Sequence, residues 1–62
     1  MNKQLKILMI EKGIKNFDLA QRLKVDPAKV SKIINGWLTP DDKLQKQIAQ
    51  ILKVSANEIW HK

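Results

Sequence analysis

The sequence predicts an all-α fold: a compact bundle of five short helices, with a helix-turn-helix formed by the second and third. Two observations predict it. Apolar residues recur at helical spacing along the chain, and helix-start and helix-stop signals divide the chain into short segments. The connections between these segments are only a few residues long, so consecutive helices have to pack against one another. We expect residues 1–62 to form a single domain.

Glycine and aspartate place the ends of the first three helices. The first is expected over about Lys3–Lys12, because Gly13 can supply a left-handed stop. The second is expected over about Asn16–Lys24. The third begins after Asp26, a side-chain cap, with Pro27 at the position where its missing N–H costs nothing, and it ends at an Asn-Gly pair.

Two further start signals predict the fourth and fifth helices. The segment Thr39-Pro40-Asp41-Asp42 offers a capping hydroxyl, a helix-starting proline and two acids that favour the positive end of the helix dipole. Ser55-Ala56-Asn57-Glu58 is a capping box that opens a last short helix. The residues expected to face the core are Leu5, Leu8, Met9, Leu19, Ala20, Leu23, Val25, Val30, Ile33, Ile34, Leu44, Ile48, Ala49, Ile51 and Leu52.

Composition excludes several classes of function. The chain has no Cys, which removes disulfides and thiolate metal sites, and the single His61 cannot hold a metal alone. No convincing nucleophile–base–acid set and no phosphate loop is present, so we expect neither an enzyme nor a cofactor or small-molecule substrate. No apolar run approaches the roughly 18 residues needed to span a bilayer. The N-terminus lacks the apolar core of a signal peptide, so a cytoplasmic protein is expected.

The charge balance favours a polyanionic partner. Twelve basic and six acidic residues give a formal charge of +6 and a pI near 9.9. Nucleic acid comes first among polyanions, and an anionic membrane second. The membrane is disfavoured because every amphipathic face is needed for the core.

The outward face of the third helix is suited to a DNA groove. On a helical wheel, Ala28, Lys32 and Asn35 point away from the apolar side, with Lys29 and Ser31 on the two flanks. A helix that begins at the surface with this face outward fits the width of a major groove.

Three segments resemble the lambda-repressor-like helix-turn-helix family of phage repressors, Cro proteins and XRE-type bacterial regulators. They are LAQRLKV in the second helix and its corner, KVSKIING in the third, and the tail IAQILKVSANEIW. The resemblance covers essentially Leu5 to Trp60. It implies that the third helix is the recognition helix, that the second lies across the DNA backbone, and that homodimers bind a two-fold-related operator.

The chain departs from the family pattern at several positions. Lys24 stands where the family often has a turn glycine, so either this residue adopts a positive φ or the turn differs slightly. Asn16 stands where the family usually has a phosphate-anchoring Gln. Pro27 and Ala28 replace polar base-contacting side chains and cannot form side-chain hydrogen bonds with a base.

The expected DNA contacts divide into bases and phosphates. Lys32 can hydrogen-bond a guanine edge or a phosphate, and both remain open, as does a plain solvated surface. Asn35 and Gly36 are first a helix stop, and the resemblance adds phosphate contacts from Asn35 and from backbone N–H groups of the loop that follows. The complete sets are Ala28, Lys29, Ser31 and Lys32 for bases, and Lys15, Asn16, Asn35, Gly36, Trp37 and Lys43 for phosphates.

Large apolar residues in short loops or near the end of the chain leave several placements open. Trp37 and Leu38 can fold back onto the domain, cap the exit of the third helix or join a dimer interface, and we expect Leu38 to pack within the domain. Trp60 can either cover the core or join a dimer interface, and the sequence leaves both placements open. We expect a homodimer, weak without DNA, formed through Ile51, Ile59 and Trp60, because the third helix must stay free.

One further expectation joins the first and third helices. Many relatives carry an Arg and a Glu, forming a partly buried ion pair, at the positions of Met9 and Ile34. Because both residues are apolar here, we expect them to contact each other directly.

Two functional hypotheses follow. The first is a sequence-specific transcriptional regulator that binds double-stranded DNA, a small phage or bacterial repressor acting as a homodimer on a palindromic operator. The alternative is a protein-interaction module of the antitoxin or adaptor type that uses an apolar surface at Trp37 and Trp60.

Overall fold

The computed structural model describes residues 2–60 and contains five helices and no strand within that range. The predicted all-α fold is therefore confirmed. The helices are α1 (Lys3–Lys12), α2 (Asn16–Leu23), α3 (Pro27–Ile34), α4 (Asp42–Leu52) and α5 (Ala56–Ile59). No helix in this part of the chain is long and apolar enough to cross a membrane.

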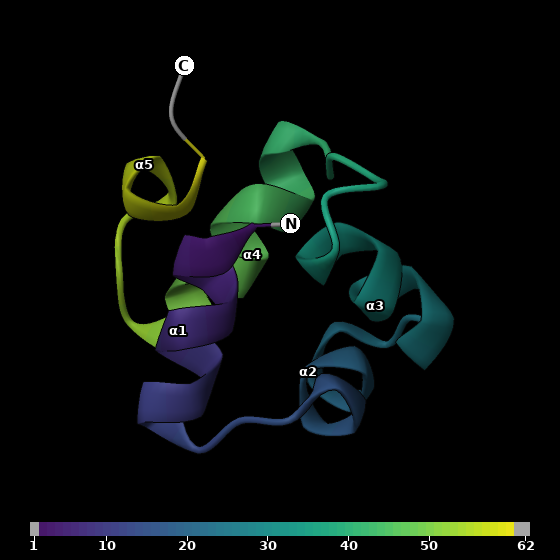
Figure 1. The fold of residues 1–62 in the computed structure, drawn as a ribbon. Helices are drawn as coiled ribbons and strands as arrows, with labels where there is room; N and C mark the ends of the chain where they lie inside the picture. Colours follow the sequence, from purple (N-terminus) through teal and green to yellow (C-terminus); the bar gives the residue numbers. More distant parts are fainter. Residues whose placement is uncertain (1, 61–62) are drawn as a thin grey trace.

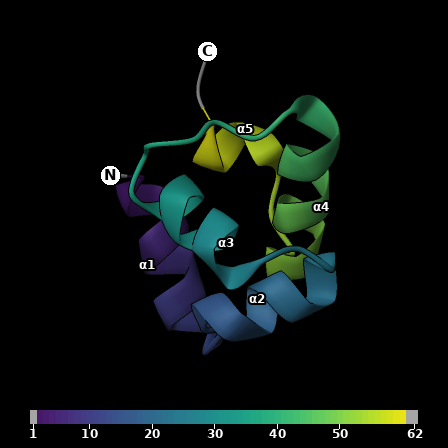
Figure 2. The ribbon, with the colours of Figure 1, turned by 90° about the vertical axis from the view of Figure 1, so that its right-hand side faces the viewer.

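The helices surround one apolar core. α4 packs against α1, α2 and α5, while α3 packs against α2 and α1. Figure 1 shows α1 crossing α4, and Figure 2, turned by 90°, shows α3 between α1 and α4 with α2 below them. Burying a Leu or Ile side chain contributes about 1.5–3 kcal/mol, so this core is the main source of stability. The largest fully buried side chains are Leu5, Leu19, Val30, Ile33, Ile48 and Leu52.

Asn2 anchors the start of α1 through its side chain and its backbone N–H. Its side-chain oxygen accepts from the backbone N–H of Leu5 at 3.1 Å, which caps the helix. Its own N–H donates to the carbonyl oxygen of Ile34 at 2.8 Å, and its side-chain N–H group donates to that of Ile59 at 3.5 Å. One residue thus holds together the beginning of α1 and the ends of α3 and α5.

At the corner between α2 and α3, Lys24 adopts a positive φ, which is one of the two possibilities that the sequence left open. Lys24 has φ 58° and ψ 44°, the left-handed conformation that a turn glycine would adopt without strain. The N–H of Val25 donates to the carbonyl oxygen of Ala20 at 3.0 Å, which closes the end of α2. Asp26 then caps α3 by accepting from the N–H of Ala28 at 2.8 Å.

The same corner recurs between α4 and α5. Lys53 has φ 59°, and the N–H of Val54 donates to the carbonyl oxygen of Ala49 at 3.0 Å. The two segments, LAQRLKV and IAQILKV, share Ala-Gln and Leu-Lys-Val at equivalent positions. The expected capping box is present, since Ser55 and Glu58 each bond the other's backbone N–H. The chain therefore contains two helix-turn-helix corners of one local design.

The start of α4 differs from the sequence-based expectation. The cap is Asp41, whose carboxylate accepts from the N–H of Leu44 at 2.9 Å, and the helix begins at Asp42. The predicted start at Thr39-Pro40 was therefore wrong. Aspartate caps helices as well as threonine does, so Asp41, directly before the first helical residue, is the N-cap in place of Thr39. Pro40 is buried before the helix, and its carbonyl oxygen accepts from the side-chain amide of the buried Gln45 at 2.9 Å.

Candidate nucleic-acid interface

α3 presents a polar face to solvent and an apolar face to the core. Val30, Ile33 and Ile34 are buried, as the helical wheel predicted. The opposite face is open: Ser31 is half-buried, and the exposed residues are Ala28, Lys29, Lys32 and Asn35. The predicted base-contacting residues therefore share one accessible surface of a helix that begins at the surface of the domain.

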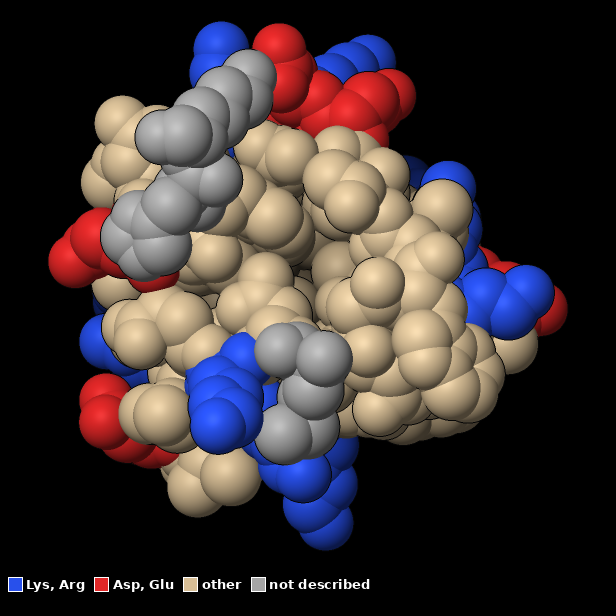
Figure 3. Space-filling view, turned by 45° about the horizontal axis from the view of Figure 1, so that its top comes forward, with Lys and Arg blue, Asp and Glu red and all other residues tan. Residues whose placement is uncertain are grey.

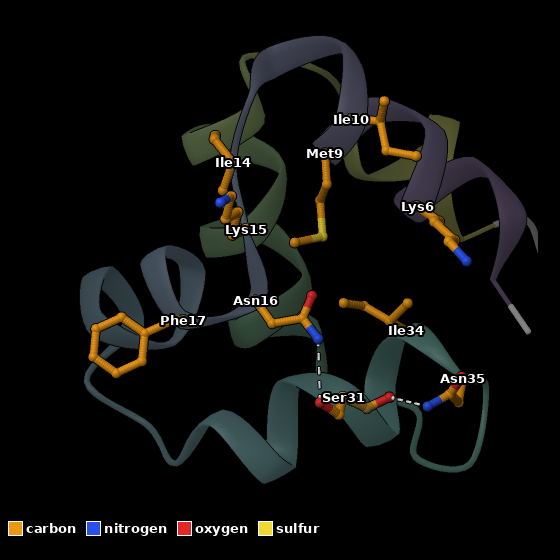
Figure 4. A pocket seen from close by; sticks show the side chains of 10 residues that line it. All are labelled: Lys6, Met9, Ile10, Ile14, Lys15, Asn16, Phe17, Ser31, Ile34 and Asn35. Atoms are coloured by element: carbon orange, nitrogen blue, oxygen red, sulfur yellow. Dashed lines mark hydrogen bonds between the residues drawn. The ribbon is translucent and has the colours of Figure 1, made fainter.

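A side-chain hydrogen bond ties the start of α2 to the middle of α3. The amide N–H group of Asn16 donates to the hydroxyl oxygen of Ser31 at 3.2 Å. Because a hydroxyl is both donor and acceptor, Ser31 keeps its own hydrogen for another acceptor, and Asn16 keeps its carbonyl oxygen and second N–H. Asn16 thus supports the exposed face of α3 and still has polar atoms for a ligand (Figure 4).

The exit of α3 already uses the backbone groups that the resemblance assigned to phosphate. The backbone N–H of Gly36 donates to the carbonyl oxygen of Ile33 at 3.1 Å, and the backbone N–H of Trp37 donates to the carbonyl oxygen of Lys32 at 2.9 Å. The side-chain amide of Asn35 donates to the carbonyl oxygen of Ser31 at 2.9 Å. These bonds close the helix end. Polar contacts beyond the domain are therefore left to side chains, such as the remaining amide atoms of Asn35 and the indole N–H of Trp37.

Two of the predicted lysine contacts lie on opposite sides of this face. Lys15, at the entry to α2, is exposed, and its backbone N–H donates to the carboxylate of Asp18 at 3.3 Å. Lys43 lies in the first turn of α4 and shares a shallow hollow with Lys29 and Asp41. The carboxylate of Asp41 therefore lies beside the two cations of this hollow.

A hollow of about 530 Å³ opens between α1, the start of α2 and α3. Met9 and Ile34 lie at its floor, where they are 4% and 8% exposed, belong to one core cluster and point toward one another (Figure 4). The exposed apolar side chains of Ile10 and Phe17 line its sides. Sequence reasoning missed these two because single apolar residues on a polar face carry no periodic signal.

The residues expected at a dimer interface are less accessible than predicted. Ile59 is only 4% exposed and belongs to the core, so its assignment to an open contact surface needs correction. α5 is too short to bury one face and present a second apolar face. Ile51 and Trp60 are half-buried and pack against the same core. The side chain of Trp37, in contrast, is 78% exposed. We expected Leu38 to pack within the domain, but its side chain is 36% exposed and is therefore only partly covered.

A family model of known proteins matches most of this chain. Residues 4–60 match the family model of the Cro/C1-type helix-turn-helix DNA-binding domain. Searches of curated proteins and of solved structures found no match. The matched range includes all of α4 and α5 and nearly all of α1, and it holds the α2–α3 corner with its exposed basic face. The chain belongs to the Cro/C1-type helix-turn-helix family and is a DNA-binding regulator of the XRE and lambda-repressor-like group.

Proposed function

We propose that this chain is a sequence-specific transcriptional repressor that places α3 in the major groove of double-stranded DNA. Two copies bind the two halves of a palindromic operator, and occupancy of the operator excludes the polymerase. The main support for this proposal is that α3 has an exposed polar face opposite its buried apolar face. The hydrogen bond from Asn16 to Ser31 holds that polar face against the start of α2. Such a regulator acts where the DNA is, in the cytoplasm of a bacterial cell.

Base contacts come from the first two turns of α3. Lys32 and Lys29 are the long donors, and a lysine pairs with the O6 and N7 acceptors of guanine. Ser31 uses the hydroxyl hydrogen that the bond from Asn16 leaves available. Ala28 has no polar group, and its value lies in allowing a close approach, including contact with a thymine methyl.

Phosphate contacts come from side chains that flank α3. Asn16 and Lys15 lie at the start of α2, Asn35 lies at the end of α3, and Lys43 lies in the first turn of α4. Phosphate contacts set the position and orientation of the protein, while base contacts carry the sequence information. Because its backbone N–H is already bonded, Gly36 is not included in this set, and Trp37 can contribute only its indole N–H.

Selection of bound duplexes from a random pool tests this function. The expected product is a palindrome whose half-sites are about 10–10.5 base pairs apart, centre to centre, or a multiple of that spacing. Affinity for the selected duplex should also fall steeply as salt is raised, because each phosphate contact releases counterions. If the pool yields no enriched sequence although the chain binds DNA at low salt, sequence-specific repression is excluded.

A second candidate function is a protein-interaction module of the antitoxin or adaptor type. The 78% exposure of Trp37 favours it, because large exposed apolar side chains mark contact surfaces. Trp60 no longer supports such a surface, since it is half-buried against the core. A gel shift on random DNA at low salt separates the candidates: a chain of charge +6 that fails to bind there is not a DNA regulator.

A further inference from the structure

The hollow between α1, α2 and α3 has an apolar floor and apolar sides. Met9 and Ile34 form the floor, and the side chains of Ile10 and Phe17, which are 70% and 65% exposed, line the sides. Its volume of about 530 Å³ falls within the roughly 300–1,000 Å³ of small-molecule sites in proteins. A ligand in the hollow would therefore remove apolar surface from water without displacing a core side chain.

The charged groups of the hollow have one sign. Lys6 on α1 and Lys15 at the entry to α2 stand on opposite sides of it (Figure 4). No Asp or Glu is among the described residues that line it. Asp18, the acid in the first turn of α2, accepts from the backbone N–H of Lys15 and does not line the hollow. The hollow therefore favours an occupant with a negative charge.

Neutral donors lie beside these cations. Asn16 lines the hollow and donates one side-chain N–H to Ser31, which leaves its second N–H for a ligand. The positive end of the α2 dipole lies at the same place, since Asn16 is the first residue of that helix. A carboxylate accepts hydrogen bonds from ammonium and amide groups together, so its chemistry suits the entry to α2.

Other occupants use only part of this site. A phosphate of DNA would meet the lysines and leave Ile10 and Phe17 in water. A second copy of the chain, placed symmetrically, would bring Lys6 and Lys15 of both copies together. The wide uncharged area on the face in Figure 3 is bordered by side chains of both signs, so it shows no such preference for an anion.

We propose that the hollow binds a small organic carboxylate with an apolar body, and that this ligand and DNA exclude each other. The apolar body covers Ile10 and Phe17, and the carboxylate lies at the entry to α2. The exclusion rests on the proposed function, because Asn16 and Ser31 line the hollow and also belong to the proposed DNA contacts. The ligand thus acts as an inducer that releases the operator. The sequence did not indicate this site, because its residues come from three helices and no motif joins them.

Octanoate is the probe, because it joins a carboxylate to an apolar chain. Titrated into the free protein, it should shift the NMR signals of backbone amides around the hollow, such as those of Ile10 and Phe17, and leave those of α5 unchanged. Octylammonium has the same chain with the opposite charge, and acetate has the charge without the chain. Both should bind at least about tenfold more weakly. Equal binding of octanoate and octylammonium, or shifts spread over the whole surface, would overturn the proposal.

Two substitutions test the two halves of the site. Phe17→Ala should weaken octanoate binding by roughly three- to tenfold through lost apolar contact. Lys6→Glu should weaken it by about threefold or more and reduce the preference over octylammonium. Both side chains are exposed and neither is a proposed DNA contact, so the fold and the DNA interface are retained.

Ile7→Ala and Lys46→Glu are the matched controls. Ile7 and Lys46 are exposed and do not line the hollow, and the substitutions make comparable changes in apolar surface and in charge. Octanoate affinity should stay within about twofold of the wild type in both. Wild-type affinity in Phe17→Ala and Lys6→Glu, or equal losses in the controls, would contradict binding in the hollow.

Gel shifts in the presence of octanoate test the link to DNA. At about ten times its dissociation constant, octanoate should lower the apparent affinity for DNA by about tenfold, as competition requires. Phe17→Ala should need correspondingly more octanoate, and acetate at the same ionic strength corrects for the effect of salt. Octanoate that fills the hollow without lowering DNA affinity would overturn the exclusion. If octanoate binds as expected but no duplex sequence is selected from the random pool, the carboxylate site stands and sequence-specific repression fails.

Discussion

The backbone N–H of Asn2 donates to the carbonyl oxygen of Ile34 at 2.8 Å, which joins the start of α1 to the last residue of α3. The last four carbonyl groups of a helix have no partner inside the helix, so this bond satisfies one of them. It also fixes the end of the proposed recognition helix to the rest of the bundle. The orientation of α3 therefore depends on the second residue of the chain.

Asn2→Ala should lower the free energy of unfolding by about 0.5–2 kcal/mol, the usual cost of losing a side-chain cap. The substitution removes the bonds to Leu5 and Ile59 and keeps the backbone bond to Ile34. Urea unfolding followed by circular dichroism measures the change. Asn2→Ser restores a capping oxygen and should recover most of the loss, whereas equal losses for both substitutions would argue against capping as the cause.

Glycine at the two left-handed lysines should stabilise the protein. Lys24 and Lys53 have φ near 60°, which costs a residue with a Cβ roughly 1 kcal/mol that glycine does not incur. Part of this gain is offset by the greater freedom of glycine in the unfolded chain. Lys24→Gly and Lys53→Gly should each raise the melting temperature by a few degrees. Lys46→Gly, on the exposed face of α4, is the control and should destabilise by about 1 kcal/mol.

Met9 and Ile34 provide a test of the packing between α1 and α3. Met9→Arg places a charge against an apolar neighbour and should cost about 3 kcal/mol, the penalty of an unpaired buried charge. Adding Ile34→Glu supplies the opposite charge and should recover a large part of that loss. A double-mutant cycle of unfolding free energies measures the coupling. Additive effects of the two substitutions would show that the side chains do not interact.

Lys32 and Asn35 should differ in their effect on specificity. Lys32→Ala should remove discrimination at one base pair of each half-site, worth roughly 1–3 kcal/mol. Asn35→Ala should weaken binding to all sequences about equally, because a phosphate contact carries no sequence information. Binding to a panel of singly substituted operators measures both.

A different result for Lys32→Ala would assign Lys32 to a phosphate. A uniform loss of affinity, with the salt slope reduced by about one, would make Lys32 a phosphate contact. Specificity would then come from the shorter side chains of α3 or from DNA shape.

Local signals in the sequence predicted most of the fold. Asp26-Pro27 and the capping box at Ser55 were placed correctly, as was the left-handed stop at Gly13. Such signals can be identified from sequence because a cap acts over three or four residues and needs no distant partner. The recurrence of LAQRLKV as IAQILKV was also present in the sequence, but its meaning became clear only when both corners showed the same φ at their lysines.

The tertiary structure decided what each side chain faces. Ile59 is buried and Trp37 is exposed, although both are large apolar residues next to helix ends. Gln45 can be buried without an unsatisfied amide because the carbonyl oxygen of Pro40 accepts its hydrogen, a pairing that helical periodicity cannot indicate. Helical spacing determined which residues share a face, since that depends only on the 3.6-residue turn. Whether a face meets another helix, a loop or solvent depends on segments distant in the sequence, and only their packing in three dimensions decides it.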